Sequence, residues 1–178
     1  MIKSCAGLGS AWIVSNLSGI AAAQEHAHHA ALSQATPRLE FLTPEQAVEV
    51  EAIASQIIPT DDTPGAREAH CAHFIDFVLQ ASPPPTQTQW RNALSALKEA
   101  GFQAADATGR AALVAAMSKP ERDRSASHPA FAAYRLIKQQ NTFAFYTSRA
   151  GMIEALDYKG NSFNKTFPAC NHPEHHVV

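Results

Sequence analysis

The sequence predicts an all-α fold, a small irregular helical bundle with extended N- and C-terminal arms. Three observations indicate this fold. Alanine, the residue with the highest helix propensity, makes up 34 of the 178 residues. Apolar residues recur at spacings of three and four along most of the chain, as they do on one face of a helix. No segment alternates apolar and polar residues convincingly, as a half-buried strand would.

The first expected helix begins at Pro44 and ends before Pro59. Thr43 is a suitable N-cap, Pro44 suits the first helical position, and Gln46 completes a capping box. One apolar face follows at helical spacing: Ala47, Val50, Ala54, Ile57 and Ile58.

A turn and a second helix come next. We interpret Asp61 and Asp62 as Asx-turn or capping residues rather than calcium ligands, because no distal glutamate follows at the spacing of a calcium loop. The second helix is expected over residues 66–79. Its inward side chains are expected to be Ala69, Ala72 or His73, Phe74, Phe77 and Val78. The prolines of residues 82–85 then break the chain, in polyproline conformation.

Three more helices are expected further along the chain. The third carries Trp90, Ala93, Leu94, Leu97 and Ala100 and ends at Gly101. The fourth is short and carries Ala111, Leu113, Val114 and Met117 before Pro120. An aromatic-rich stretch from about residue 129 predicts a long central helix, followed by one short helical turn over residues 152–156.

Residues 1–23 are expected to be a signal peptide. Lys3 precedes a charge-free stretch that ends in three alanines at residues 21–23. Glycine, serine and asparagine interrupt this stretch, so it is too polar for a membrane span. Its weak hydrophobicity is typical of twin-arginine export. Because residues 1–3 (MIK) resemble the end of the twin-arginine motif, we expect translation to start upstream of Met1. The mature protein is then periplasmic.

The mature chain is expected to have three parts. Residues 24–40 form a linker arm, residues 41–157 the helical domain and residues 158–178 an extended C-terminal tail. Such a tail cannot bury its aromatic residues against itself, so it is expected to lie along this domain or along a partner.

Composition and motifs exclude several classes of function. A chain with 46% hydrophobic and 17% charged residues is not intrinsically disordered. Its 14 basic and 16 acidic residues give no electrostatic footprint for nucleic acid. The sequence has no Gly-x-Gly-x-x-Gly for a dinucleotide, no Cys-x-x-Cys-His for c-type haem and no Gly-x-Ser-x-Gly elbow. We therefore expect no catalytic residue and no cofactor in this chain.

Histidines are the remaining candidates for chemistry. His70 and His73 share one face of the second helix, so both imidazoles could reach one ion. Cys170, His172 and His175 could complete a Cys/His zinc site from the tail. The alternative is that the helix histidines are partly exposed and bind no metal.

The cysteines leave two alternatives open. Cleavage of the signal peptide removes Cys5 and leaves Cys71 and Cys170 in an oxidising compartment. The pair forms a disulfide between helix and tail, or Cys71 is buried while Cys170 is bonded to or packed on another subunit.

Six motifs are spread over residues 39–175. They are residues 42–46 (LTPEQ), 57–69 (IIPTDDTPGAREA), 74–76 (FID), 145–148 (FYTS) with 151–152 (GM), 156–161 (LDYKGN) and 170–175 (CNHPEH). These motifs resemble the small subunit, called subunit 3 or gamma, of membrane-bound gluconate 2-dehydrogenase. His70-Cys71 departs from the family pattern, in which small or apolar residues are usual.

The resemblance implies a periplasmic heterotrimer. Its other members would be a large FAD-containing subunit of the glucose-methanol-choline class and a multihaem cytochrome c that passes electrons to quinone. This chain would then be non-catalytic, would stabilise the large subunit and assist its twin-arginine export, and would meet the membrane only through the complex. The alternative is a stand-alone periplasmic metal-binding protein that uses the histidine clusters.

Aromatic residues and the tail are the expected partner contacts, since aromatic anchors dominate interfaces. The expected interface residues are Tyr146, Tyr158, Phe163, Phe167, Cys170, His172, Pro173 and His175. For each aromatic residue the alternative is packing in the core.

Overall fold

The computed structural model describes residues 19, 21–25 and 38–160. All regular structure in these residues is helical, which confirms the predicted all-α bundle. The elements are α3 (Pro44–Ile57), α4 (Cys71–Gln80), α5 (Pro84–Glu99), α6 (Ala107–Ser118), the 3-10 turn η1 (Lys119–Glu121), α7 (Phe131–Thr147) and the π-helical η2 (Ala150–Ala155).

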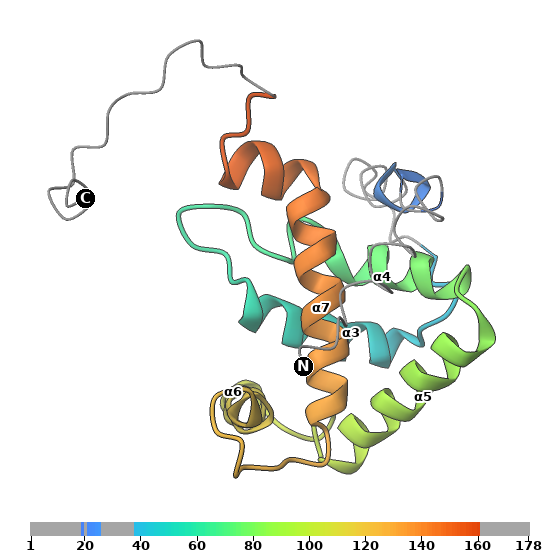
Figure 1. Ribbon diagram of the computed structural model, residues 1–178, viewed down its shortest axis with the longest axis vertical. Coiled ribbons are helices and arrows are strands. Elements are labelled where there is room, and N and C mark those ends of the chain that lie inside the picture. The colour runs from blue at the N-terminus through green and yellow to red at the C-terminus, as the bar shows by residue number, and fades with distance from the viewer. Residues whose placement is uncertain (1–18, 20, 26–37, 161–178) are drawn as a thin grey trace, which may run out of the picture.

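Helix α7 runs through the middle of the molecule, with the other long helices around it (Figure 1). It contacts α3, α4, α5 and α6. The core lies between these helices and includes the fully buried Trp90, Phe74, Phe102, Ile53 and Ile137. The sequence prediction of a long central helix in this region is therefore confirmed.

Helix α3 begins as predicted. The Thr43 hydroxyl accepts a hydrogen bond from the Gln46 backbone N–H at 3.2 Å, and the Gln46 side chain accepts one from the Thr43 N–H at 3.0 Å. Pro44 occupies the first turn, where its missing N–H leaves no hydrogen bond unmade. The capping box is thus formed in full.

Helix α4 begins at Cys71, so the prediction of a start at residue 66 was wrong by one turn. Residues 66–70 form turns instead, and His70 caps α4 with a left-handed backbone, φ 51°. A residue in this conformation cannot continue a right-handed helix. The apolar spacing of residues 66–79 shows which side chains face the core and carries no information about the backbone at His70.

Helix α5 begins at Pro84, so the prediction of polyproline conformation was wrong for Pro84 and Pro85. Pro83 is extended, with ψ 150°, and serves as the N-cap, while Pro84 and Pro85 occupy the first helical turn. The first N–H groups of a helix have no partner within the helix, so two prolines there remove no hydrogen bond. Tandem prolines therefore start this helix.

The chain before α3 is fastened to α4 by Asp76. This buried carboxylate accepts hydrogen bonds from the backbone N–H groups of Glu40, Phe41 and Leu42, at 2.8, 3.0 and 2.7 Å. The bonds join segments 34 to 36 residues apart, so they fix where α3 starts relative to α4.

Residues 21–25 form a short helical segment beside the end of α7. Ala23 is buried, and the Gln24 side-chain amide donates to the Ala144 carbonyl at 3.2 Å and to the Thr147 hydroxyl. No helix in the described part of the chain is both long and apolar enough to cross a membrane.

Candidate functional site

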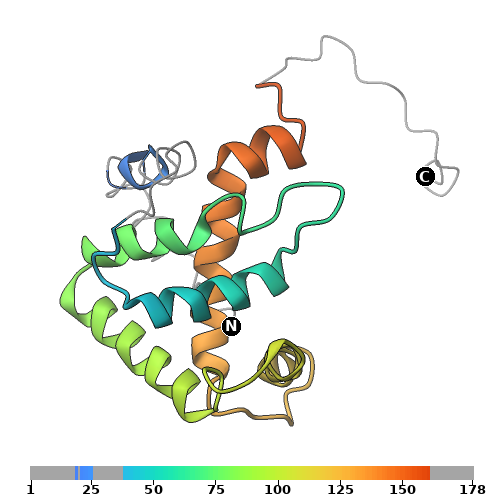
Figure 2. The ribbon, with the colours of Figure 1, turned by 180° about the vertical axis from the view of Figure 1, so that it is seen from behind.

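The loop between α3 and α4 projects from the helical body (Figures 1 and 2). Glu68 closes it, because one carboxylate oxygen accepts from the Thr60 hydroxyl at 2.6 Å and from the Gly65 N–H at 2.9 Å. The Thr60 hydrogen bond also lowers the pKa of Glu68. At the tip, Asp61 accepts from the Thr63 N–H at 2.9 Å, so the predicted Asx turn is confirmed.

Gly65 is required where this loop closes on itself. Ala66 donates its backbone N–H to the Ile58 carbonyl at 3.0 Å, which brings the two ends of the loop together. A Cβ on Gly65 would lie 2.6 Å from backbone atoms of Pro59 and Thr60. The backbone approach leaves no room for a side chain, which explains the glycine within the motif of residues 57–69.

A second tight corner joins α7 to η2. The Ser148 hydroxyl donates to the Phe145 carbonyl at 2.7 Å and accepts from the Gly151 N–H at 3.0 Å. A Cβ on Gly151 would collide with the Phe145 carbonyl oxygen. Ser148 and Gly151 therefore turn the chain sharply at the end of the central helix.

Exposed apolar side chains gather on and around this corner. We define the α7–η2 surface by its four exposed large apolar residues, Tyr146, Ile153, Leu156 and Tyr158. Tyr146 is 46% exposed and its ring rests edge-on against the buried Phe145, with centroids 5.1 Å apart. Leu156 is 59% exposed. Figures 1 and 2 show η2 at the end of α7 that lies opposite α6.

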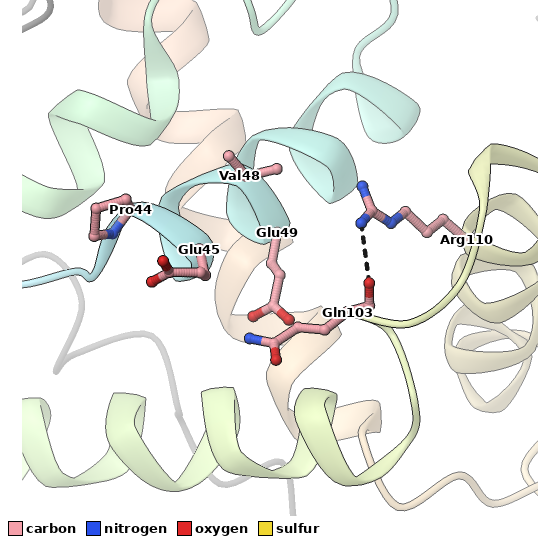
Figure 3. A pocket seen from close by; sticks show the side chains of 6 residues that line it. All are labelled: Pro44, Glu45, Val48, Glu49, Gln103 and Arg110. Atoms are coloured by element: carbon pink, nitrogen blue, oxygen red, sulfur yellow. Dashed lines mark hydrogen bonds between the residues drawn. The ribbon is translucent and has the colours of Figure 1, made fainter.

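A hollow of about 390 Å³ lies between α3 and the segment that joins α5 to α6. We call it the Glu49 hollow. Its lining residues, drawn in Figure 3, are Pro44, Glu45, Val48, Glu49, Gln103 and Arg110. Glu49 points from α3 toward the Gln103 side chain, and Arg110 faces it from the first turn of α6 (Figure 3).

Glu49 is buried without a hydrogen-bond partner. It is 2% exposed, and neither carboxylate oxygen has a partner among the described residues. Burial raises the pKa of Glu49, while the nearby Gln103 amide and the charges of Arg110 and Lys98 lower it to a smaller extent. The Arg110 guanidinium instead donates to the Phe102 and Gln103 carbonyls, at 3.3 Å each.

Of the predicted metal ligands, His70 and His73 lie close together, with ring centroids 5.8 Å apart. Within the described ranges no three residues of the His, Cys, Asp and Glu types gather as a metal site. Cys71 is free and buried there, and burial raises the pKa of its thiol to about 12. Cys170, His172 and His175 lie outside the described residues, so the zinc site and both disulfide alternatives stay predictions.

Comparison with known families gives one match. The family model described as Gluconate 2-dehydrogenase subunit 3 matches residues 44–164, more than half of the chain. The chain belongs to this family. Comparisons with curated proteins and with solved structures give no match.

Membership of the gluconate 2-dehydrogenase subunit 3 family confirms the resemblance predicted from the motifs. The match begins at the first residue of α3 and includes both glycine corners and the α7–η2 surface. It ends before Phe167, Cys170, His172, Pro173 and His175. These residues and Phe163 lie outside the described residues, so their contacts stay predictions.

The sequence interpretation missed four residues to which the structure gives a role. Ile153 and Leu156 belong to a stretch expected to be one short turn, with no reason to single them out. Glu49 and Asp76 were not named as site residues at all. The available signal for Glu49 was its position next to Val50, which is buried on the apolar face of α3. Side chains beside such a face are often covered by neighbouring helices.

Proposed function

We propose that this chain is the non-catalytic small subunit of a periplasmic, membrane-associated, flavin-dependent dehydrogenase of sugars, sugar acids or alcohols. Family membership supports the proposal, since the family's description is that of a subunit of gluconate 2-dehydrogenase. In this proposal a large subunit of the glucose-methanol-choline class carries FAD and the substrate site. A multihaem cytochrome c subunit carries the electrons onward.

The single observation that carries the role of this chain is the α7–η2 surface. Large exposed apolar residues that gather at one end of a small protein are typical of an interaction site. Tyrosine is also enriched among the residues that contribute most to binding energy. The Ser148 and Gly151 corner presents these side chains on an ordered backbone, so less conformational entropy is lost when a partner binds.

Export of the large subunit is the second part of the proposed role. A large subunit that binds FAD before export crosses the membrane folded, which is the task of the twin-arginine route. We propose that residues 1–23 supply that signal for both chains. The chain would then reach the periplasm attached to the large subunit and would associate with the inner membrane through the complex.

Omission of the chain tests this role. The large subunit is expressed with and without this chain, and flavin content and dehydrogenase activity are measured in the periplasmic fraction. We expect both to be lost without the chain, and the purified chain alone to be colourless and inactive. Full periplasmic activity of the large subunit by itself, or dehydrogenase activity of this chain by itself, would contradict the proposal.

A further inference from the structure

We propose that the Glu49 hollow binds an organic cation, an ammonium or guanidinium group carried on a short aliphatic stem. The hollow lies on α3 and the α5–α6 connection, whereas the α7–η2 surface is built from the end of α7 and from η2. The hollow therefore shares no residue with the surface that supports the accessory role.

The floor of the hollow lacks a positive partner. Both Glu49 oxygens are buried and accept no hydrogen bond from the described residues. A buried carboxylate left in this state is unfavourable, because it has lost its water and the neighbouring Gln103 amide offsets that loss only in part. A cation that donates to these oxygens would replace the lost solvation.

The nearest arginine is already engaged. The Arg110 guanidinium donates to two backbone carbonyls and lies over the Phe102 ring, 5.6 Å from the ring centroid. These contacts fix its charge on the α6 side of the hollow. No described ion pair joins Arg110 or Lys98 to Glu49, so the carboxylate is left for a cation from outside.

Glu45 adds a second negative charge on the same face of α3. It stands four residues before Glu49, and like charges at this spacing repel each other on a helix. Hydrogen bonds from its own backbone N–H and from Thr43 lower the pKa of Glu45, so it is ionised at neutral pH. Glu45 therefore adds to the negative charge that a cation would meet at the hollow.

The rim explains why the cation should be organic. Pro44 and Val48 are apolar, and Val48 is exposed, so together they suit an aliphatic stem. A calcium or magnesium ion would require six or more oxygen ligands, and the hollow offers two carboxylates beside an arginine. Gln103 is exposed and its side chain lies next to the Glu49 carboxylate, so it would move aside to admit the ligand.

Titration of the full chain with n-butylammonium chloride tests the proposal. The matched control ligand is n-butanol, which has the same stem without the charge. We expect saturable binding of n-butylammonium but not of n-butanol, measured by chemical shifts of the backbone amides around Glu49. Glu49→Gln should weaken binding by about tenfold or more, because one charge-assisted hydrogen bond is lost. Glu45→Gln should weaken it less, since Glu45 is exposed.

Four results would overturn the proposal, three with these ligands and variants and one with calcium. The first three are equal binding of n-butanol, unchanged binding by a Glu49→Gln variant whose circular dichroism matches wild type, and binding that appears only in Arg110→Gln. The third result would mean that Arg110 itself pairs with Glu49 and fills the hollow. Binding of calcium in preference to n-butylammonium would also contradict it.

The source of the cation is distinguished in the purified complex. If a lysine or arginine side chain of a partner subunit fills the hollow, the isolated chain binds n-butylammonium and the complex does not. If the ligand is a free amine, both bind it. Either result supports the site, and neither depends on whether this chain assists export of the partner.

Discussion

Asp76 and Glu49 are both buried carboxylates with 2% exposure, yet their surroundings are opposite. Asp76 accepts three backbone N–H groups from residues 40–42, with donor–acceptor distances between 2.7 and 3.0 Å. Glu49 accepts none from the described residues and lines a hollow. Equal burial therefore goes with a structural role for Asp76 and with a carboxylate that is available to bind a ligand for Glu49.

The difference shows that burial alone does not define a functional carboxylate. The decisive quantity is whether the protein itself supplies the donors that replace water. Where it does, as at Asp76, removal of the carboxylate leaves backbone groups unpaired. Where it does not, as at Glu49, removal of the charge relieves an unfavourable burial.

Asp76→Ala is expected to change the free energy of unfolding more than the substitutions that follow. It leaves three backbone N–H groups without an acceptor, one of them fully buried, and should lower the free energy of unfolding by about 3 kcal/mol. Urea denaturation followed by circular dichroism measures the change. Asp76→Asn is the matched control and should lose less, because its amide oxygen still accepts. A loss below about 1 kcal/mol for Asp76→Ala would show that the two carboxylates do not differ as described.

Glu49→Gln is expected to stabilise the fold, whereas Asp76→Ala destabilises it. The amide keeps the shape of the side chain and removes the buried charge, so the free energy of unfolding at neutral pH should rise by about 1 kcal/mol. Urea denaturation followed by circular dichroism measures this rise in the free energy of unfolding. A loss of stability comparable to that of Asp76→Ala would mean that Glu49 has a partner within the fold.

The stability gained by Glu49→Gln is expected to depend on pH. Because burial raises the pKa of Glu49 above its ordinary value of 4.5, the folded chain holds that proton more tightly than the unfolded chain. The contribution of Glu49 to stability is therefore fully present below pH 4.5 and is lost as the pH rises through the raised value. We expect wild type and Glu49→Gln to be equally stable at low pH and to diverge above it. A constant difference at all pH values would contradict this assignment.

Cys71 is a third buried titratable group, and the effect expected for it is the smallest. Its thiol stays protonated at neutral pH because burial raises its pKa to about 12, so it needs no charged partner. Iodoacetamide should label Cys71 only after denaturation, as measured by peptide mass spectrometry. Rapid labelling of Cys71 in the folded chain would show that this part of the core opens readily.

Local sequence chemistry predicted much of this fold. Thr43, Pro44 and Gln46 interact only with one another, so their capping box could be predicted from spacing alone. The start of α4 could not, because the left-handed backbone of His70 reflects how the loop after Gly65 closes. Pro84 was misjudged for a related reason, since proline both ends and begins helices.

The candidate sites depend on contacts between distant segments. Tyr146 and Tyr158 were predicted as interface residues from their aromatic chemistry, and the structure places both on the exposed α7–η2 surface. Glu49 owes its burial to the α5–α6 connection more than 50 residues away, and Asp76 owes its partners to residues 40–42. No spacing within one helix encodes such pairings.

Capture of the large flavin subunit by variants of this chain tests whether partner binding depends on the α7–η2 surface. Tyr146→Ala combined with Leu156→Ala should weaken capture by about 30-fold or more. Gln89→Ala, an exposed position on α5 that belongs neither to the α7–η2 surface nor to the Glu49 hollow, should behave like wild type. Undiminished capture by the double variant, or equal weakening by Gln89→Ala, would contradict this dependence.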